Sequence, residues 1–565
     1  MATIDDQTEA WYGAEGQISQ LRGLLFKLGC LGATLLALLL VFVFLLYVAN
    51  DAIEPMSVEP IWTVTLTAPI WAVSVTVPLP AWWLAVAATV GAPALALTGY
   101  YYRFDPRAGE VAYAALGLPI AATLLAGGVV IAFRHIVSPR EWLALVVAAA
   151  VAVGLLALHV RTRDAAAVER GLVATLVPLL VVVGVPGVVP SLRGLILSLP
   201  VLPLPSLSLL GTFAAPVGLG VAWYVSRVRE SPRAGWLAGG ATVVASALGL
   251  VAAPLVGIAA TTWIVLVTVV GVPVGLYVER VVRRGEGIAG LAMPVVIGAG
   301  VVACALVVEA LGFSGPNVWF DWDFLTTAHS RDPYDAGIYP ALVGSVMLII
   351  VVAVSAFPVG VGAAIYLEEY APSEGPLGRF VELIEINIAN LAGVPSVVYG
   401  LLGVALFVNT AGLGRGIVVV GGLTVGLLVL PIVIVSAQEA IQAVPDSQRR
   451  AAYGMGATRW QMVRTTVLPR AMPGILTGTI LALGRAIGET APLLMVGVAA
   501  VVRIPPNSFF SRFSAMPRQI FSWARLAQPE FYHGVLAAGV LVLLTVLLMM
   551  NGTAILLRNK YQRRE

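Results

Sequence analysis

The sequence predicts an all-α, polytopic membrane protein. Of its 565 residues, 59% are hydrophobic and only 11% are charged, whereas charged residues make up about a quarter of a soluble protein. The apolar residues gather into runs long enough to cross a bilayer, which takes about 20 residues of helix. The arginines lie between these runs, and the net charge is only +3, so a nucleic-acid partner is not expected. We therefore expect a multi-pass protein of the cell membrane, in contact with the lipid bilayer.

A first membrane span is expected from Leu24 to Val48. Arg22 and Lys27 lie at its beginning, and acidic residues follow it from Asp51 onward. Because positive charges favour the cytoplasmic side, residues 1–23 are expected to be a cytoplasmic tail. This tail is too long and too acidic for a cleaved signal peptide, so the span should remain as a membrane anchor.

Residues 24–284 are expected to form an accessory block of about eight transmembrane helices. The segment from Ile61 to Val77 alternates Thr and Val between prolines, which is typical of an extended outer loop. Clusters of arginine at alternate ends of the apolar runs support the number of crossings. After the first span, the expected spans are Trp82–Tyr100, Val111–Phe133, Trp142–Val160, Leu172–Val189, Leu207–Val225, Trp236–Leu255 and Thr261–Val278.

Residues 288–565 are expected to form a second block with roughly six spans. An even number of crossings in each block would place the loop 439–470 and both termini in the cytoplasm. The expected spans are Leu291–Leu311, Tyr339–Val361, Ile386–Val408, Ile417–Ser436, Met472–Val498 and Val535–Leu556.

The loop 439–470 is expected to contain two short helices. Pro445 with Asp446 or Ser447 favours a helix start, Gly454 and Gly456 favour its end, Thr458 can cap a second helix, and Pro469 should end that helix. The arginines between these signals should form a cationic surface that faces water; they are Arg449, Arg450, Arg459, Arg464 and Arg470. The simpler alternative is a solvated loop that only follows the distribution of positive charge.

Two charged residues fall inside an expected span. Arg485 and Glu489 lie within the apolar run from Ala471 to Val498. Residues four apart on a helix share a face, and an ionised side chain at membrane depth costs at least about 2.5 kcal/mol. We therefore expect the two to pair and to face a bundle interior or a watery cavity. The alternative is a structural ion pair that joins two helices.

A break is expected in the span that contains Gly393 and Pro395. Irregular backbone at membrane depth is tolerated where it lines a cavity or packs within protein. Ser396 and Tyr399 then offer hydroxyl groups, either toward a pore or to neighbouring helices.

Several kinds of chemistry are not expected. The chain holds only two lysines, Lys27 and Lys560, and neither follows the glycine-rich pattern of a Walker A loop. The four histidines and two cysteines lack the spacing of a metal site. We expect no catalytic residue, no metal and no cofactor bound by this chain.

Several motifs of the second block resemble a known family. The loop is similar to the EAA loop of ABC importer permeases, with which Ala451, Ala452, Gly456, Leu468 and Pro469 are in register. It departs from that pattern at Arg450, where the family has Glu, and at Thr466, where it has Ile. The wordings IYLEEYAP, NLAGVPSVVYGLLG, AYGMGATRWQ and GRAIGETAPLL resemble the PstA family of phosphate permease subunits, and the resemblance covers about residues 288–565.

The resemblance implies a six-helix, MetI-like permease core that follows the accessory block. It implies inward movement of inorganic phosphate by alternating access, with ATP and Mg²⁺ bound by a partner. The implied partners are a sister permease, an ATPase dimer and an extracytoplasmic phosphate-binding protein. The implied substrate path includes Arg485, Glu489, Ser396 and Tyr399. The implied ATPase-coupling residues are Ser447, Arg450, Ala451, Ala452, Tyr453, Gly456, Leu468 and Pro469.

Other functions stay open on the sequence alone. A permease for molybdate, tungstate or sulfate would use a cavity arginine equally well. An ion-driven secondary carrier would need coupling carboxylates at the membrane midplane and would leave the EAA-like loop idle. A membrane sensor or scaffold would not need Arg485. The accessory block holds no acid–base pair within a span, so we interpret it as a helical layer, with a second transport site as the alternative.

Overall fold

The fold is almost entirely helical. The computed structural model describes residues 20–53, 62–68, 71–77, 82–162, 167–184, 190–199, 204–312, 321–372 and 374–562. Among these residues, 12 helices are long and apolar enough to cross a membrane, or 13 if one bent pair is a single span. The described strands form one antiparallel hairpin within the segment that was predicted to be extended. The predicted class, an all-α polytopic membrane protein, is confirmed.

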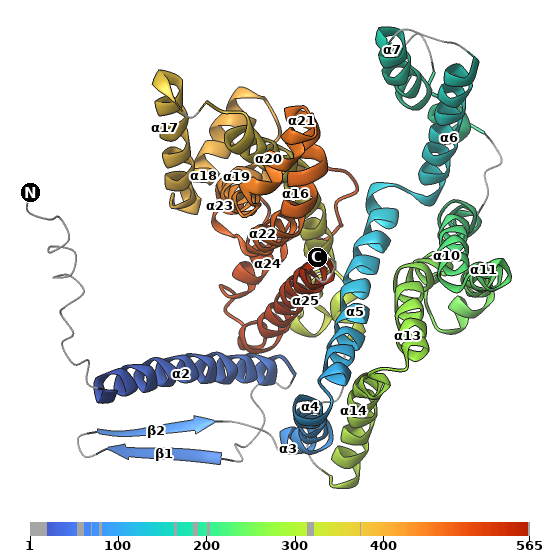
Figure 1. Ribbon diagram of the computed structural model, residues 1–565. Coiled ribbons are helices and arrows are strands. Elements are labelled where there is room, and N and C mark those ends of the chain that lie inside the picture. Colours follow the sequence, from blue (N-terminus) through green and yellow to red (C-terminus); the bar gives the residue numbers. More distant parts are fainter. Residues whose placement is uncertain are drawn as a thin grey trace, which may run out of the picture.

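The accessory block occupies the N-terminal half of the chain (Figure 1). Its elements are α2 (Gln20–Ile53), β1 (Trp62–Ala68), β2 (Trp71–Val77), α3 (Trp82–Val86), η1 (Ala87–Gly91), α4 (Ala92–Phe104), α5 (Pro106–Ile131), η2 (Ala132–Ile136), α6 (Pro139–Thr162), α7 (Ala167–Pro178), η3 (Leu179–Val183), α8 (Leu192–Leu197), α9 (Pro205–Leu209), η4 (Leu210–Ala214), α10 (Ala215–Arg229), α11 (Pro232–Leu255), α12 (Ala260–Val265), η5 (Leu266–Gly271) and α13 (Val272–Arg284).

The second block contains the most buried part of the described chain. Its elements are η6 (Ile288–Leu291), α14 (Ala292–Ala310), α15 (Trp322–Thr326), η7 (Pro333–Asp335), α16 (Tyr339–Glu369), α17 (Gly375–Ala392), α18 (Ser396–Gly403), η8 (Val404–Thr410), α19 (Val418–Gln442), α20 (Asp446–Gly454), α21 (Arg459–Met462), η9 (Val463–Val467), α22 (Leu468–Gly488), α23 (Ala491–Met495), α24 (Met516–Trp523), η10 (Phe531–Val535) and α25 (Leu536–Gln562).

One predicted span is too short to cross, and another contains the break that was predicted at Gly393 and Pro395. In place of Leu172–Val189, the described apolar helix runs only from Leu172 to Val183, which is too short to cross, and residues 185–189 lie outside the described part. In place of Ile386–Val408, α17 and α18 meet at an angle of 106°. The even number of crossings that placed both termini on one side therefore no longer follows from the spans.

Helix α14 packs with the accessory block, although it was predicted to begin the second block. It contacts α3, η1, α4 and α5. A Cβ placed at Gly300 would lie 2.5 Å from the carbonyl oxygen of Thr89, and the Tyr101 hydroxyl donates to the Ala289 carbonyl at 2.6 Å. The boundary at residue 288 stays a prediction, but these contacts join both sides of it.

Helices α16, α19 and α22 form the centre of the C-terminal half (Figure 1). Their shared core includes Met347, Val425 and Ile475, which are fully buried. Lipid offers apolar side chains no advantage from leaving water, so close packing of small residues must hold such helices together.

Three glycines allow this close packing. On α19, Gly422 lies against Val351 of α16, where a Cβ would approach the valine Cβ to 2.5 Å. On α22, Gly474 and Gly478 lie four residues apart and face Ala440 and Ser436 of α19. A Cβ at Gly478 would lie 2.5 Å from the Ser436 Cβ, so this seam requires glycine.

We expect Gly478→Leu to destabilise the seam between α19 and α22 by about 1–3 kcal/mol, the usual cost of overpacking. The measurement is the apparent melting temperature of the purified chain in detergent. Gly362→Leu is the matched control, because nothing lies within 4 Å of a Cβ at Gly362 on α16. Equal melting temperatures for the two variants would contradict this account of the seam.

An aromatic cluster holds the loops next to the end of α22. Trp523, Phe324 and Phe531 pack with Ile487 of α22. The Trp523 indole N–H donates to Nδ1 of His329 at 3.0 Å, so this histidine nitrogen is unprotonated. Burial, followed by the positive charge of Arg503, holds the pKa of His329 below its usual value of 6.5.

This lowered pKa predicts a loss of stability in acid. Between the folded pKa and 6.5 the unfolded chain binds more protons, so the stabilising effect is complete above 6.5 and is lost as the pH falls through that window. We expect a lower melting temperature at about pH 5.5 than at about pH 7.5. His329→Asn removes the titrating group, so this difference should shrink. An unchanged difference in His329→Asn would contradict the prediction.

Candidate functional site

The two charged residues predicted within a span lie at the end of α22. Arg485 is in the last turn of the helix, which ends at Gly488. Glu489 follows with extended backbone (ψ 127°), so the predicted helix to Val498 and the shared helical face are wrong. Pro492, at the start of α23, cannot donate to a continuing helix. The two side chains nevertheless pair, with Arg485 Nε 3.2 Å from Glu489 Oε1.

The ion pair leaves Arg485 with free donors. Its side chain is 52% exposed and that of Glu489 is 16% exposed. Only Nε of the guanidinium makes a hydrogen bond to a described residue. The two terminal nitrogens therefore have no hydrogen-bond partner among the described residues, and a guanidinium offers its donors in the planar arrangement that suits an oxyanion.

Helix α18, which follows the bend after α17, packs against the short helix that follows this pair. Gly400 of α18 packs directly on Met495 of α23, the short helix that follows Glu489. Tyr399 is 6% exposed, and its hydroxyl donates to the carbonyl of Leu391 across the break at 2.8 Å. Ser396 is half-buried in the first turn of α18. Tyr399 thus ties the bend together, and a place for Ser396 and Tyr399 in a substrate path stays a prediction.

Helix α20 ends as the sequence signals predicted. The amide of Gly456 donates to the Tyr453 carbonyl and the amide of Ala457 donates to the Ala452 carbonyl, which is the hydrogen-bond pattern of a Schellman motif. Gly456 has φ +82°, a left-handed conformation that costs other residues free energy. Glycine at this position therefore sets the direction in which the chain leaves α20.

The second surface helix continues into the membrane. Thr458 and Gln461 form a capping box at its start, as the cap signal predicted. The prediction that Pro469 ends this helix is wrong, because the chain is one helical span from Arg459 to Gly488. A π-helical turn, Val463–Val467, ends two residues before the proline, and local π-helical adjustments help to satisfy the backbone groups that a proline leaves unpaired. The second helix of the surface loop and Arg485 therefore belong to one continuous helical span.

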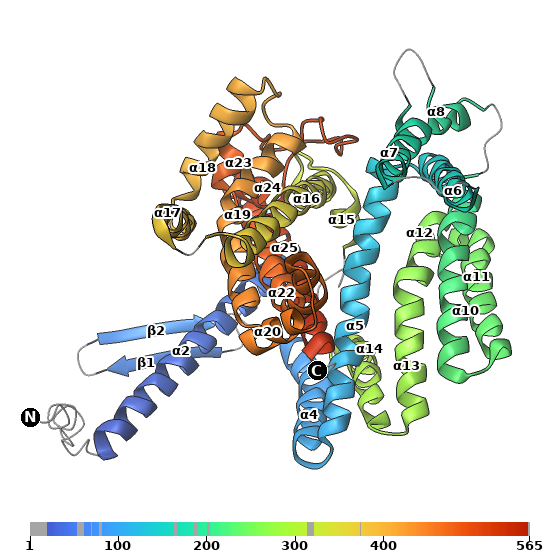
Figure 2. The same ribbon diagram turned by 45° about the horizontal axis from the view of Figure 1, so that its top comes forward.

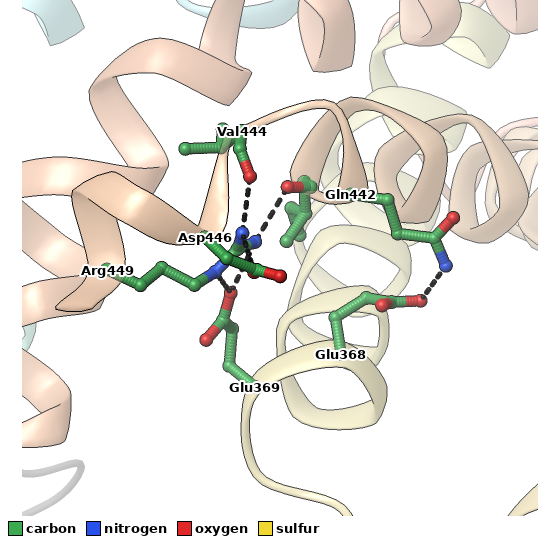
Figure 3. A network of polar contacts seen from close by, with 7 residues as sticks. Glu368, Glu369, Gln442, Val444, Asp446 and Arg449 are labelled. Atoms are coloured by element: carbon green, nitrogen blue, oxygen red, sulfur yellow. Dashed lines mark hydrogen bonds and ion pairs between the residues drawn. The ribbon is translucent and has the colours of Figure 1, made fainter.

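Arg449 fixes α20 to the core, whereas the sequence predicted that it faces water (Figure 3). Its side chain is only 17% exposed and pairs with Glu369 at 3.0 Å, whose side chain is 6% exposed. It also donates to the carbonyls of Ile441, at 2.9 Å, and Val444, and to Asp446 at 3.1 Å. These bonds join the end of α16, the end of α19 and the start of α20.

A second set of polar contacts strengthens the same joint. Gln442 of α19 donates to Glu368 Oε1 at 2.8 Å (Figure 3). Gln438 of the same helix donates to that oxygen at 3.0 Å. Gln438 also donates to Glu385 of α17 at 3.4 Å. The sequence reasoning did not identify Glu368 and Glu369 as functional, although both lie in the IYLEEYAP wording. Their adjacency at a helix end, opposite an arginine-rich loop, was the available signal.

Most predicted coupling residues lie on an exposed surface. Ala452 is only 4% exposed and Leu468 is half-buried, so these two side chains pack inward. The exposed members are Ser447, Arg450, Ala451, Tyr453, Gly456 and Pro469. Met455 and Trp460, which the sequence reasoning did not select, are 84% and 58% exposed. The surface is thus partly apolar as well as cationic.

Comparisons with known proteins decide the family. The model of the binding-protein-dependent transport system inner membrane component matches residues 357–560. The phosphate transport system permease protein PstA of Mycobacterium leprae is 34% identical over 253 residues, which cover 44% of this chain and 80% of that protein. The chain belongs to the PstA-like permeases. This permease is also 33% identical to PstA of Xylella fastidiosa, over 42% of its own length and 82% of that protein.

Two further similarities have lower coverage or a lower score. The permease is 33% identical to the probable ABC transporter permease protein YqgI of Bacillus subtilis, over 35% of this chain and 66% of that one. A chain from an inward-facing structure of the MetNI methionine ABC transporter aligns at 15% identity and a TM-score of 0.31, over 41% of this permease and 99% of that chain. The family match includes both the loop 439–470 and Arg485. The chain is therefore a multi-pass permease of the ABC importer type.

Proposed function

We propose that this permease moves inorganic phosphate into the cell as part of an ATP-driven importer. The observation that carries the proposal is one continuous helical span, Arg459–Gly488, which begins at the exposed loop surface and bears Arg485 near its other end. The names of the PstA relatives support phosphate as the substrate. Arg485 would meet the ion during its passage.

The geometry of Arg485 suits brief binding of an oxyanion. Its terminal nitrogens are free of hydrogen bonds to the described residues, while Nε is held by Glu489. The carboxylate would orient the guanidinium and weaken its hold on the anion. Transport requires release as well as capture, so a moderate affinity is an advantage.

The loop surface would transmit force from a separate ATPase. ATP and Mg²⁺ would bind to an ATPase dimer on the cytoplasmic side, and the exposed residues around Tyr453 and Met455 would contact it. Arg449 and Glu369 hold α20 on the core, so movement of α20 would reach α16 and α19. Coupling then requires that the ATPase favour one of the two states of the permease. A sister permease and an extracytoplasmic phosphate-binding protein would complete the importer.

Co-purification with transport assays tests this proposal. The tagged permease, expressed with its ATPase and sister permease, should retain the ATPase and take up radioactive phosphate. Gly456→Val, which strains the φ of +82°, should release the ATPase and lower uptake. Gly454→Ala is the control, because a Cβ there meets nothing within 4 Å. Uptake of sulfate or molybdate instead of phosphate, or uptake without any ATPase, would overturn the proposal.

A further inference from the structure

A large crevice lies where the accessory block meets the permease core, beside the contact of α5 with α25. It lies between α5 on one side and α16 and α25 on the other, with a volume of about 1840 Å³. Figures 1 and 2 both show α5 standing between the C-terminal helices and α13. Pockets for small ligands typically measure about 300–1,000 Å³. This crevice is therefore suited to a larger occupant.

The walls of the crevice are apolar over nearly the thickness of a bilayer. On α5 and η2 the lining runs from Leu118 to Ala132, and on η10 and α25 it runs from Val535 to Thr553. At 1.5 Å per residue these segments are about 21 and 27 Å long, against about 30 Å for the hydrocarbon core of a membrane. Both belong to spans that are apolar enough to cross a membrane. The occupant must therefore be hydrocarbon over most of its length.

Acidic groups lie at one end of the crevice. Of its described lining residues, only Asp321 and Glu530 are charged, and the Tyr334 hydroxyl belongs to the same lining. Their elements meet at this end: η7, which holds Tyr334, contacts η10, which follows Glu530, and Phe324 of the helix that Asp321 caps belongs to the same apolar cluster as Phe531. Neither carboxylate has an ion-pair partner among the residues described. An anionic head group would be repelled there, whereas an ammonium group would be attracted.

We propose that this crevice binds a diacyl phospholipid with an ammonium head group, such as phosphatidylethanolamine. Its acyl chains lie between α5 and α25, and its ammonium group meets Asp321 and Glu530. The lipid thereby adds contacts between the accessory block and the permease core. This binding does not depend on which ion the permease transports.

Native mass spectrometry of the full chain tests the lipid site. The purified protein is incubated in detergent with equal amounts of phosphatidylethanolamine and phosphatidylglycerol, and the bound lipids are counted after washing. We expect phosphatidylethanolamine to be retained in preference to phosphatidylglycerol by roughly fivefold. Ala121→Trp fills the wall of the crevice on α5 and should abolish retention. Ala96→Trp, at an exposed position of α4 outside the crevice, should leave it unchanged.

A second variant keeps the test decisive if Ala121→Trp fails to fold. Asp321→Asn with Glu530→Gln keeps the shape of the lining but removes its two charges, and it should remove the preference between the two lipids. Equal retention by wild type and Ala121→Trp would overturn the proposal. So would a preference of the wild type for phosphatidylglycerol, or a preference that survives the loss of both carboxylates.

Discussion

Replacing Arg485 with alanine is expected to lower phosphate uptake by at least about tenfold. A hydrogen bond to a charged group contributes about 1.5–3 kcal/mol, which corresponds to roughly 10–150-fold in rate. The side chain is 52% exposed and has unused donors, so its loss would remove the proposed oxyanion contact and leave the core packing in place. Radioactive phosphate uptake at several concentrations measures the effect.

Two conservative variants separate a role in transport from a structural ion pair. Arg485→Lys keeps the charge but not the planar set of donors, so uptake should be intermediate. Glu489→Gln keeps the shape but releases the guanidinium, so phosphate should bind more tightly and leave more slowly, with lower KM and lower maximal rate. ATPase co-purification should be unchanged in all three. Normal uptake by Arg485→Ala would favour a sensor or scaffold over a transporter.

The sequence predicted the Arg485–Glu489 contact because both residues lie close together in one apolar run. Spacing along the chain was sufficient for that pair, even though the helix ends between them. Spacing along the chain could not place Ser396 and Tyr399, because the surroundings of these two residues depend on the 106° bend and on the packing of α18 against α23. A hydroxyl that faces a neighbouring carbonyl has the same sequence signal as one that faces a pore.

The fold was predictable where hydropathy alone decides it. Long apolar runs gave most spans, whereas Leu172–Val189 failed because the described helix ends at Val183. The continuation of the helix through Pro469 depends on the π-helical turn before it, and hydropathy carries no signal for such a turn. The glycine seams follow from which helices meet, and in a chain with 58 glycines composition does not mark the few that matter.

Arg449 is the residue that sequence reasoning placed most wrongly. It lies within a run of exposed arginines, and charge patterning predicts a solvated surface for such a run. Its partner, Glu369, lies 80 residues earlier, so no local pattern connects them. The pair forms because the ends of α16 and α19 meet next to the start of α20.

Replacing Arg449 with methionine is expected to destabilise the permease by about 3 kcal/mol or more. Removing one partner of a buried ion pair leaves the other charge uncompensated, at a typical cost of about 3–5 kcal/mol. The carboxylate of Glu369, which is already buried from solvent, would lose its positive partner. The carbonyls of Ile441 and Val444 would lose their hydrogen-bond donor. The measurement is the melting temperature in detergent, together with retention of the ATPase.

Arg450→Met is the matched control, because Arg450 is the exposed neighbour on the same helix. It should leave the melting temperature unchanged and affect only contact with the ATPase. The double variant Arg449→Met with Glu369→Leu removes both charges, so it should regain part of the lost stability. If the double variant melts at no higher temperature than Arg449→Met, the loss of stability comes instead from the unpaired carbonyls of Ile441 and Val444. A melting temperature that is equal in Arg449→Met and Arg450→Met would show that the pair does not hold α20 on the core.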